Sequence, residues 1–483
     1  MQLKDKSISG FLWVFLDQVG GQLIGFLVSI VLARILVPSD FGLIAMTTLF
    51  VNIGNTLMDS GLTMSLIRSK ENKQIDYATV FYINISVGIL IYFLLYFAAP
   101  LVASFYSSPL LEDILKVYTL TFIINSFFAV QKAILVKDMN FKYQLRISLP
   151  SLILSGIFGV YLAYLGHGVW SLVYMYIVKS IIDGILYWQL IKWRPTREFS
   201  WKLAKYHLKY GINICISSLI HVIYTDLYNL FIGRIYNPAI LGYYFRANST
   251  KTLIVNNLST TLDKVLFPVF AQIQDDDARL KIVYRRVMQQ VFFWICPILT
   301  YFLIMASPIF TFVFSDKWLP AVPYFQILCL VGILTPIQTY NVNILKVKGR
   351  SDLVLKLEYI KKPIFIIGII ISIKYGIMAL MWNQVIANLV GLFINSYYSG
   401  RMIDYSLLEQ VKDLFKTIMS TLVIGAFGYY LLLSLQAILS PLVLIMLVAL
   451  LCLPLYLGLS YLIKNPPFGE FSVIFKKFIK SRQ

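Results

Sequence analysis

The feature that most constrains this chain is a succession of long apolar segments, each of about 20 residues or more. A helix of about 20 mostly apolar residues crosses a membrane, and an open strand could not pair its backbone groups in lipid. The sequence therefore predicts an all-α integral membrane protein with about 14 transmembrane helices. The segments lie at residues 8–36, 40–66, 77–106, 112–136, 146–165, 169–191, 207–235, 239–268, 287–314, 322–346, 354–374, 377–399, 414–436 and 440–463.

Composition excludes several other classes of protein. Of the 483 residues, 59% are apolar and 13% are charged, whereas an average soluble domain has about 25% charged residues. A soluble enzyme, a disordered chain or a secreted disulfide scaffold would not have this composition. The net charge of +19 would suggest nucleic acid in a soluble protein, but the basic residues lie in short clusters between apolar segments. Membrane topology explains them, and we expect no nucleic-acid partner.

The connections between segments alternate in charge. Those after odd-numbered segments are short and nearly free of Lys and Arg, while those after even-numbered segments are basic, as at 68–73 and 279–286. The positive-inside rule places the basic connections and both termini in the cytoplasm. Two basic stretches, 196–209 and 471–480, have the pattern of amphipathic helices that lie on anionic membrane lipids; a solvated linker and tail are the alternative.

An internal repeat is visible. Residues 33–42 (ARILVPSDFG) resemble residues 233–242 (GRIYNPAILG), with Arg, Ile, Pro and Gly recurring at an offset of 200. Six helices per repeat give both repeats the same orientation. We expect an N-terminal six-helix lobe at 1–195, a cytoplasmic amphipathic linker at 196–210, a C-terminal six-helix lobe at 211–400, two extra transmembrane helices at 401–465 and a basic cytoplasmic tail at 466–483.

Polar side chains form stripes along the first, second, seventh and eighth segments. Such side chains usually face a bundle interior or a watery cavity. Because the first two segments are the repeat partners of the other two, the stripes predict a central polar cavity; hydrogen bonding between helices is the alternative. The candidate substrate-binding residues on these stripes are Arg246, Asn52, Asn55, Gln18, Gln22, Asn257 and Thr250.

Charges within the segments suggest two further roles. Arg246 has no acid one turn away and could grip a diphosphate with two parallel hydrogen bonds; a pair with Asp226 is the alternative. Asp17, and after it His221, is a candidate for coupling to H⁺ or Na⁺, although Asp17 could equally accept hydrogen bonds from neighbouring helices. The sequence has no catalytic constellation, nucleotide-binding loop or metal-ligand cluster. We therefore expect a protein without enzymatic activity or a cofactor.

The segment LARILVPSDFGLIAM, the six-plus-six-plus-two helix plan and the basic linker resemble the polysaccharide transporters of the MOP superfamily. Within these Wzx-type flippases the chain is most similar to exporters of colanic and teichuronic acid. The resemblance implies a V-shaped, two-lobe monomer that works with a polysaccharide polymerase or assembly machinery in the bacterial cytoplasmic membrane. It would move an undecaprenyl-diphosphate-linked oligosaccharide to the outer leaflet by alternating access. Related lipid II flippases hold the diphosphate with cavity arginines; here only Arg246 matches.

Three functions therefore compete. The first is flipping of a lipid-linked oligosaccharide. The second is efflux of small molecules or drugs by a transporter of the same superfamily, and the third is an integral-membrane glycan polymerase or ligase. The Asn, Thr and Arg side chains favour a neutral or anionic headgroup over a cationic drug. A polymerase would be expected to carry a sizeable outward loop, and the predicted outward connections are short.

Overall fold

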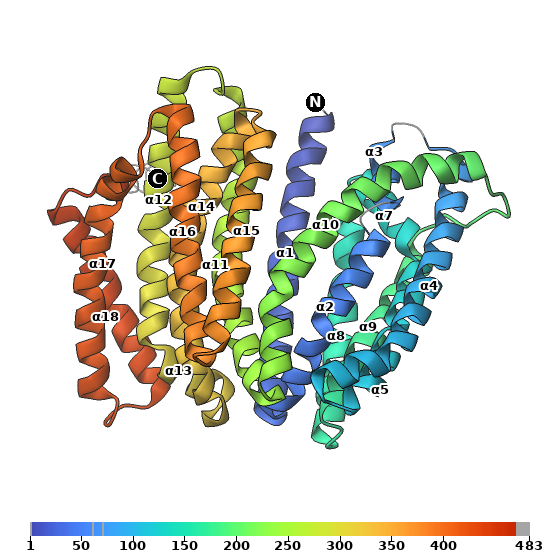
Figure 1. Cartoon of the computed structure of the whole chain (residues 1–483), viewed down its shortest axis with the longest axis horizontal. Coiled ribbons are helices and arrows are strands. Elements are labelled where there is room, and N and C mark those ends of the chain that lie inside the picture. Colours follow the sequence, from blue (N-terminus) through green and yellow to red (C-terminus); the bar gives the residue numbers. More distant parts are fainter. Residues whose placement is uncertain (1, 60–61, 70–71, 470–483) are drawn as a thin grey trace. The chain divides into compact units, whose positions relative to one another are not determined.

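The computed structural model describes residues 2–59, 62–69 and 72–469; within the helices, the side chains of residues 2–12, 14–16, 59, 210, 213–214, 256–269 and 271 lie outside that description. Every regular element in this part of the chain is helical, from α1 to α18 with one 3-10 helix, η1 (Figure 1). The prediction of an all-α fold is confirmed.

The chain divides into two compact units between Phe245 and Arg246. In the first unit α2 packs against α4 and α10, and α1 packs against α8. Because α10 packs within the first unit, this unit continues past the predicted linker at 196–210. Its helices are α1 (Gln2–Ile35), α2 (Pro38–Asp59), α3 (Leu62–Arg68), α4 (Gln74–Tyr106), α5 (Leu110–Tyr118), α6 (Leu120–Ser126), α7 (Ala129–Lys137), α8 (Phe141–Tyr164), α9 (Val169–Leu190), α10 (Trp201–Ile235) and the start of α11 (Pro238–Gln272).

In the second unit α14 packs against both α12 and α16, and α15 packs against α16. The last two helices join this unit because α17 packs against α12 and α18 packs against α13 and α17. The elements are the rest of α11, α12 (Asp277–Ile304), α13 (Ala306–Phe314), η1 (Asp316–Ala321), α14 (Val322–Val347), α15 (Ser351–Ile373), α16 (Ile377–Ile403), α17 (Leu407–Leu435) and α18 (Pro441–Leu462).

The protein is a multi-pass membrane protein. Within the described residues 11 helices are long and apolar enough to cross a membrane, or up to 12 if a bent pair counts as one span. That pair, Leu110–Ser126 and Ala129–Lys137, bends by 51° where a single continuous segment was expected at 112–136. The count of fourteen spans, the equivalence of the two repeats and the V-shaped arrangement of the lobes stay predictions.

The two copies of the repeated motif pack against each other. Helices α2 and α11 begin 200 residues apart, at Pro38 and Pro238. A Cβ atom on Gly42 would lie 1.7 Å from the carbonyl oxygen of Pro238, and one on Gly242 would lie 1.9 Å from that of Pro38. The contact is reciprocal and brings backbone against backbone, so each copy of the motif requires glycine at this position.

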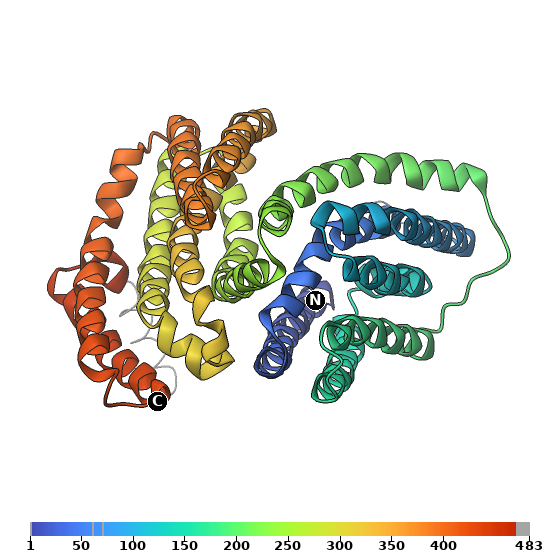
Figure 2. The same ribbon diagram turned by 60° about the horizontal axis from the view of Figure 1, so that its bottom comes forward.

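The first turns of α10, residues 201–209, form a segment that we call the arm. The candidate span within α10 begins only at Cys215, and the arm runs past the ends of α3 and α4 before the helix turns (Figure 1 and Figure 2). Ala204 and His207 are buried, whereas Trp201 and Tyr206 are exposed. This two-faced pattern suits the predicted interfacial helix, which stays a prediction; residues 471–480 lie outside the described residues.

Candidate functional site

A buried carboxylate joins α2 to α10 in the first unit. The amide nitrogen of Asn52 donates to one oxygen of Asp226 at 2.8 Å, and that of Asn229 donates to the other at 3.0 Å. Asn229 also lies 3.4 Å from the hydroxyl of Thr48. Asp226 is 7% exposed. We call these four residues the Asp226 cluster; its amides stabilise a charge that would otherwise be costly within a membrane span.

The cluster contains one predicted site residue, Asn52. Asn55 lies one turn further along α2 and is half-buried. Sequence reasoning considered Asp226 only as a partner for Arg246 and missed Asn229, because the polar stripe predicted on α10 follows His221, which is exposed. The signal that could have found the cluster is an acid and an amide three residues apart in the middle of one span.

Asp17 on α1 lies against α8. Its carboxylate accepts hydrogen bonds from the hydroxyl of Ser148 and from the amide nitrogen of Gln144, the latter at 3.3 Å. The side chain is half-buried. Nearby on α1, Gln18 is exposed and Gln22 is half-buried, and the carbonyl oxygen of Gln22 has no hydrogen-bond partner within the described residues. Asp17 thus makes the interhelical contacts of the structural interpretation, and its role in ion coupling stays a prediction.

Arg246 lies near the start of the second unit, on α11, and is 4% exposed. Its guanidinium carbon is 5.0 Å from the ring centroid of Phe314 and 5.1 Å from that of Trp318. Both rings are fully buried. A cation in such a setting is stabilised by the aromatic faces. Arg246 therefore contacts two aromatic side chains that the polar stripes gave no reason to consider, and its role in binding substrate stays a prediction.

The other predicted residues on α11 are less informative. The hydroxyl of Thr250 donates to the backbone carbonyl of Arg246 at 2.8 Å, which is a bond within the helix, and the residue is buried. The side chain of Asn257 lies outside the described residues. Of the substrate-binding residues predicted on α11, the structure thus describes the side-chain contacts of Arg246 and Thr250.

A further polar cluster fastens the arm to the first unit. The ring nitrogen Nδ1 of the fully buried His207 lies 2.7 Å from the hydroxyl of Ser65 on α3. Its Nε2 lies 3.5 Å from a carboxylate oxygen of Asp76 on α4. Burial lowers the pKa of His207 below the usual value for histidine, and Asp76 partly offsets that effect. Neutral histidine therefore suits the docked arm. In the described part of the chain, no three His, Cys, Asp or Glu side chains gather in a way that could hold a metal.

Comparison with solved structures defines the class of protein. The fold is similar to that of the lipid II flippase MurJ in an inward closed conformation, with a TM-score of 0.74 over 97% of this chain and 100% of that one, at 14% identity. It is also similar to an inward-facing MATE multidrug resistance transporter, with a TM-score of 0.57 over 80% of this chain and 96% of that one, at 13% identity. The chain therefore has the fold of the MOP superfamily.

Comparison of sequences defines the family. A family model described as "polysaccharide biosynthesis protein" matches residues 31–323, and the chain belongs to that family. It is 26% identical to the lipopolysaccharide biosynthesis protein WzxC of Escherichia coli K12, over 77% of this chain and 76% of that protein. It is 25% identical to the teichuronic acid biosynthesis protein TuaB of Bacillus subtilis 168, over 79% of each chain. The resemblance to polysaccharide transporters expected from the sequence is confirmed.

Proposed function

We propose that this protein flips an undecaprenyl-diphosphate-linked oligosaccharide from the inner to the outer leaflet of the bacterial cytoplasmic membrane by alternating access. The observation that carries the proposal is the family match, which covers all of α2, α10 and α11, the helices that carry the Asp226 cluster and Arg246. A third relative, the succinoglycan biosynthesis transport protein ExoT of Rhizobium meliloti 1021, is 25% identical over 68% of this chain and 67% of that protein. The name of that relative joins transport to polysaccharide synthesis, which agrees with the proposal.

The Asp226 cluster suits recognition of a sugar. Because the amide nitrogen of Asn52 is held by Asp226, the carbonyl oxygen of Asn52 points elsewhere, and Asn52 itself is exposed. An amide fixed in this way presents an acceptor of defined direction to a sugar hydroxyl. The role of Asp226 is thus to position Asn52, and the role of Asn52 is to accept a hydrogen bond from the headgroup.

Arg246 suits recognition of the diphosphate. The guanidinium lies against the rings of Phe314 and Trp318, and a planar guanidinium can bind phosphate oxygens through paired N–H donors. Such charge-assisted, paired hydrogen bonds are among the strong ones. In this proposal a neutral amide, Asn52, contacts the sugar, and a cation, Arg246, binds the diphosphate.

Gradient coupling is the third part of the proposal. Asp17 is a carboxylate held by Ser148 and Gln144 in the first unit, and such a group can exchange H⁺ or hold Na⁺ when access alternates. The protein acts as a monomer with both termini on the cytoplasmic side, and it delivers its substrate to a polymerase without making or breaking a covalent bond.

Reconstitution into liposomes tests the proposal. A fluorescent undecaprenyl-diphosphate-linked oligosaccharide is placed in both leaflets, and its accessibility to a membrane-impermeant glycosidase is followed with and without an ion gradient. We expect accessibility to exceed the outer-leaflet fraction only when protein is present, with the unreacted lipid unchanged in mass. Transport of a cationic dye in place of the lipid would favour efflux, and longer glycans would favour a polymerase. Either result without flipping would contradict the proposal.

A further inference from the structure

A pocket of about 410 Å³ lies where α16 ends and α17 begins, within the second unit. Ligand pockets in proteins usually have volumes of about 300–1,000 Å³. Its walls are formed by the last turns of α16, by Asp404 and by the first residues of α17. Gly400 allows the turn to fold back closely, because a Cβ there would lie 2.7 Å from the carbonyl oxygen of Tyr405. The pocket is therefore a built feature of this connection.

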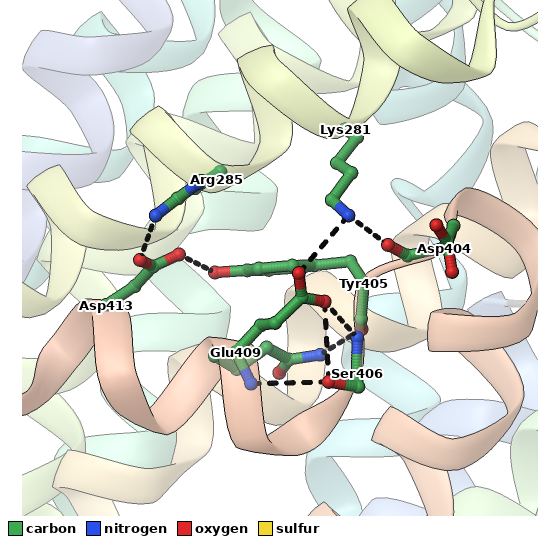
Figure 3. Close-up of polar contacts among 8 residues, drawn as sticks. Lys281, Arg285, Asp404, Tyr405, Ser406, Glu409 and Asp413 are labelled. Carbon is green, nitrogen blue, oxygen red and sulfur yellow. Dashed lines mark hydrogen bonds and ion pairs between the residues drawn. The ribbon is translucent and has the colours of Figure 1, made fainter.

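Ion pairs and hydrogen bonds outside the pocket hold the connection in place (Figure 3). Lys281 on α12 donates to the backbone carbonyl of Asp404 and lies 3.4 Å from a carboxylate oxygen of Glu409. Asp413 pairs with Arg285 and accepts a hydrogen bond of 2.6 Å from the hydroxyl of Tyr405. We call this set the α12–α17 joint. It positions the pocket without using the side-chain charges that line it.

Two opposite charges line the pocket. The carboxylate of Asp404 points away from Lys281, which contacts only its backbone oxygen (Figure 3). Arg401 lies against the ring of Tyr397, with its guanidinium carbon 4.3 Å from the centroid. Within the described residues neither side chain makes an ion pair. The pocket thus offers a cation and an anion, three residues apart. The hydroxyl of Ser406 also lines the pocket, but it caps α17: it accepts from the backbone N–H of Glu409 and donates to the Glu409 carboxylate, both at 3.3 Å.

Counted from the start of α16, the pocket lies at about the distance at which a spanning lipid leaflet changes from hydrocarbon to headgroup. Arg401 lies 24 residues after the start of α16, which is about 36 Å at about 1.5 Å per residue, while the hydrocarbon core is about 30 Å thick. An exposed apolar stripe leads along α16 to this point. Its members are Trp382, Ile386, Leu389, Phe393 and Tyr397.

We propose that this pocket binds the headgroup of a zwitterionic aminophospholipid, such as phosphatidylethanolamine, with an acyl chain along the stripe of α16. Arg401 binds the phosphate, and Asp404 accepts hydrogen bonds from the primary ammonium. Charge complementarity selects this occupant, because phosphatidylglycerol has no cation for Asp404 and the quaternary ammonium of phosphatidylcholine has no N–H to donate. The bound lipid would contact the α12–α17 joint and fix the extra helix pair to the leaflet.

Lipid titration of the full-length, delipidated protein tests this proposal, with native mass spectrometry as the measurement. Phosphatidylethanolamine, phosphatidylcholine and phosphatidylglycerol with the same acyl chains are compared on the unsubstituted protein. We expect the first to bind about tenfold more tightly than the third, the effect of about one charge-assisted hydrogen bond. Equal affinities for the three lipids, or a preference for phosphatidylglycerol, would overturn the proposal from the unsubstituted protein alone.

Two substitutions separate the roles of the charges. Arg401→Gln should weaken all three lipids by a similar factor, because all contain phosphate. Asp404→Asn should bring phosphatidylethanolamine close to the affinity of phosphatidylglycerol and leave the latter unchanged. The matched control is the Arg350–Asp352 pair, which is exposed, joined by its own ion pair at 2.8 Å and not part of the pocket. Arg350→Gln and Asp352→Asn should leave lipid binding unchanged. If these control substitutions changed the lipid affinities as much as Arg401→Gln and Asp404→Asn do, a defined site would be contradicted.

Discussion

The Asp226 cluster and Arg246 show two ways of burying a charge within this helical fold. Asp226 is 7% exposed and Arg246 is 4% exposed, so both are almost fully removed from solvent. The carboxylate is satisfied by two amide donors, whereas the guanidinium lies against two aromatic rings. Amide donors occupy the oxygens of an acid, whereas aromatic rings stabilise a guanidinium through cation–π contact. A buried charge in this fold can therefore be held by hydrogen-bond donors or by aromatic rings, and the proposed function assigns Asp226 to positioning Asn52 and Arg246 to the diphosphate.

The largest expected effect is that of Arg246→Ala. Flipping should fall by about a hundredfold, because two charge-assisted hydrogen bonds to the diphosphate are lost, while the amount of folded protein holds. The matched control is Arg234→Ala. Arg234 also lies against an aromatic ring, that of Phe105 at 5.3 Å, but it is exposed, and its loss should leave flipping nearly unchanged.

The alternative for Arg246 predicts a different pattern. If Arg246 serves mainly as an ion-pair partner of Asp226, Arg246→Ala should lower the amount of folded protein. Adding Asp226→Asn should then restore both protein level and flipping. That rescue, measured by size-exclusion chromatography and the liposome assay, would contradict the assignment of Arg246 to the diphosphate.

The next largest effect concerns the contact at which both polar helices begin. α2 carries Asn52 and α11 carries Arg246, and Gly42 lies in the reciprocal contact between their first turns. Gly42→Ala should destabilise the protein by about 1–3 kcal/mol, as overpacking does, because the added methyl group meets a backbone carbonyl that cannot rotate away. Thermal unfolding in detergent measures this effect. The control is Gly25→Ala on α1, where a Cβ would meet nothing within 4 Å; a similar loss there would contradict the explanation.

A smaller effect is expected from Asp226→Asn. An asparagine keeps one acceptor oxygen and replaces the other with a donor, so one of the two amides loses its partner and the orientation of Asn52 loosens. Flipping should fall by about tenfold, with the dependence on an ion gradient retained.

Asp17→Asn should have the opposite pattern: it should abolish the response to the ion gradient, while substrate binding remains measurable. If Asp226→Asn instead abolished the gradient response, the roles of the two carboxylates would be exchanged.

The smallest effect is a pH dependence at the arm. The groups that face His207 are Ser65 from α3, Asp76 from α4 and the neighbouring Tyr206 on α10. Because burial lowers the pKa of His207, the docked arm binds a proton less readily than the undocked arm. Its docking is therefore full above the usual histidine pKa of about 6.5 and weakens as the pH falls below it.

Hydrogen exchange measures this pH dependence. After correction for the intrinsic rate, residues 201–209 should exchange faster at about pH 5.5 than at about pH 7.5, and His207→Gln should remove the difference. His167, which is exposed between α8 and α9, provides the control: His167→Gln should leave the dependence intact. A pH dependence that survives His207→Gln would contradict the role of His207.

Much of the fold could be predicted from the sequence because membrane helices are identified by their length and apolar composition. The start of α2 and α11 at equivalent prolines was also visible as a repeat. The bend between Ser126 and Ala129 was not, since residues 112–136 contain no Pro or Gly that would mark a break in the helix. The site could be predicted only in part. Helical phase identified Asn52 and Arg246, but neither Asn229 nor Trp318 lies on a predicted stripe, because these partners depend on which helices pack together.

The most direct test of the account compares two carriers of the same oligosaccharide, one linked through a diphosphate and one through a monophosphate. In liposomes the unsubstituted protein should flip the diphosphate-linked lipid faster, by about tenfold. Arg246→Lys, which keeps the charge but loses the paired hydrogen bonds, should abolish this preference, whereas Asp226→Asn should slow both lipids and preserve it. A preference that is unchanged in Arg246→Lys, or lost in Asp226→Asn alone, would contradict the central claim that Arg246 recognises the diphosphate.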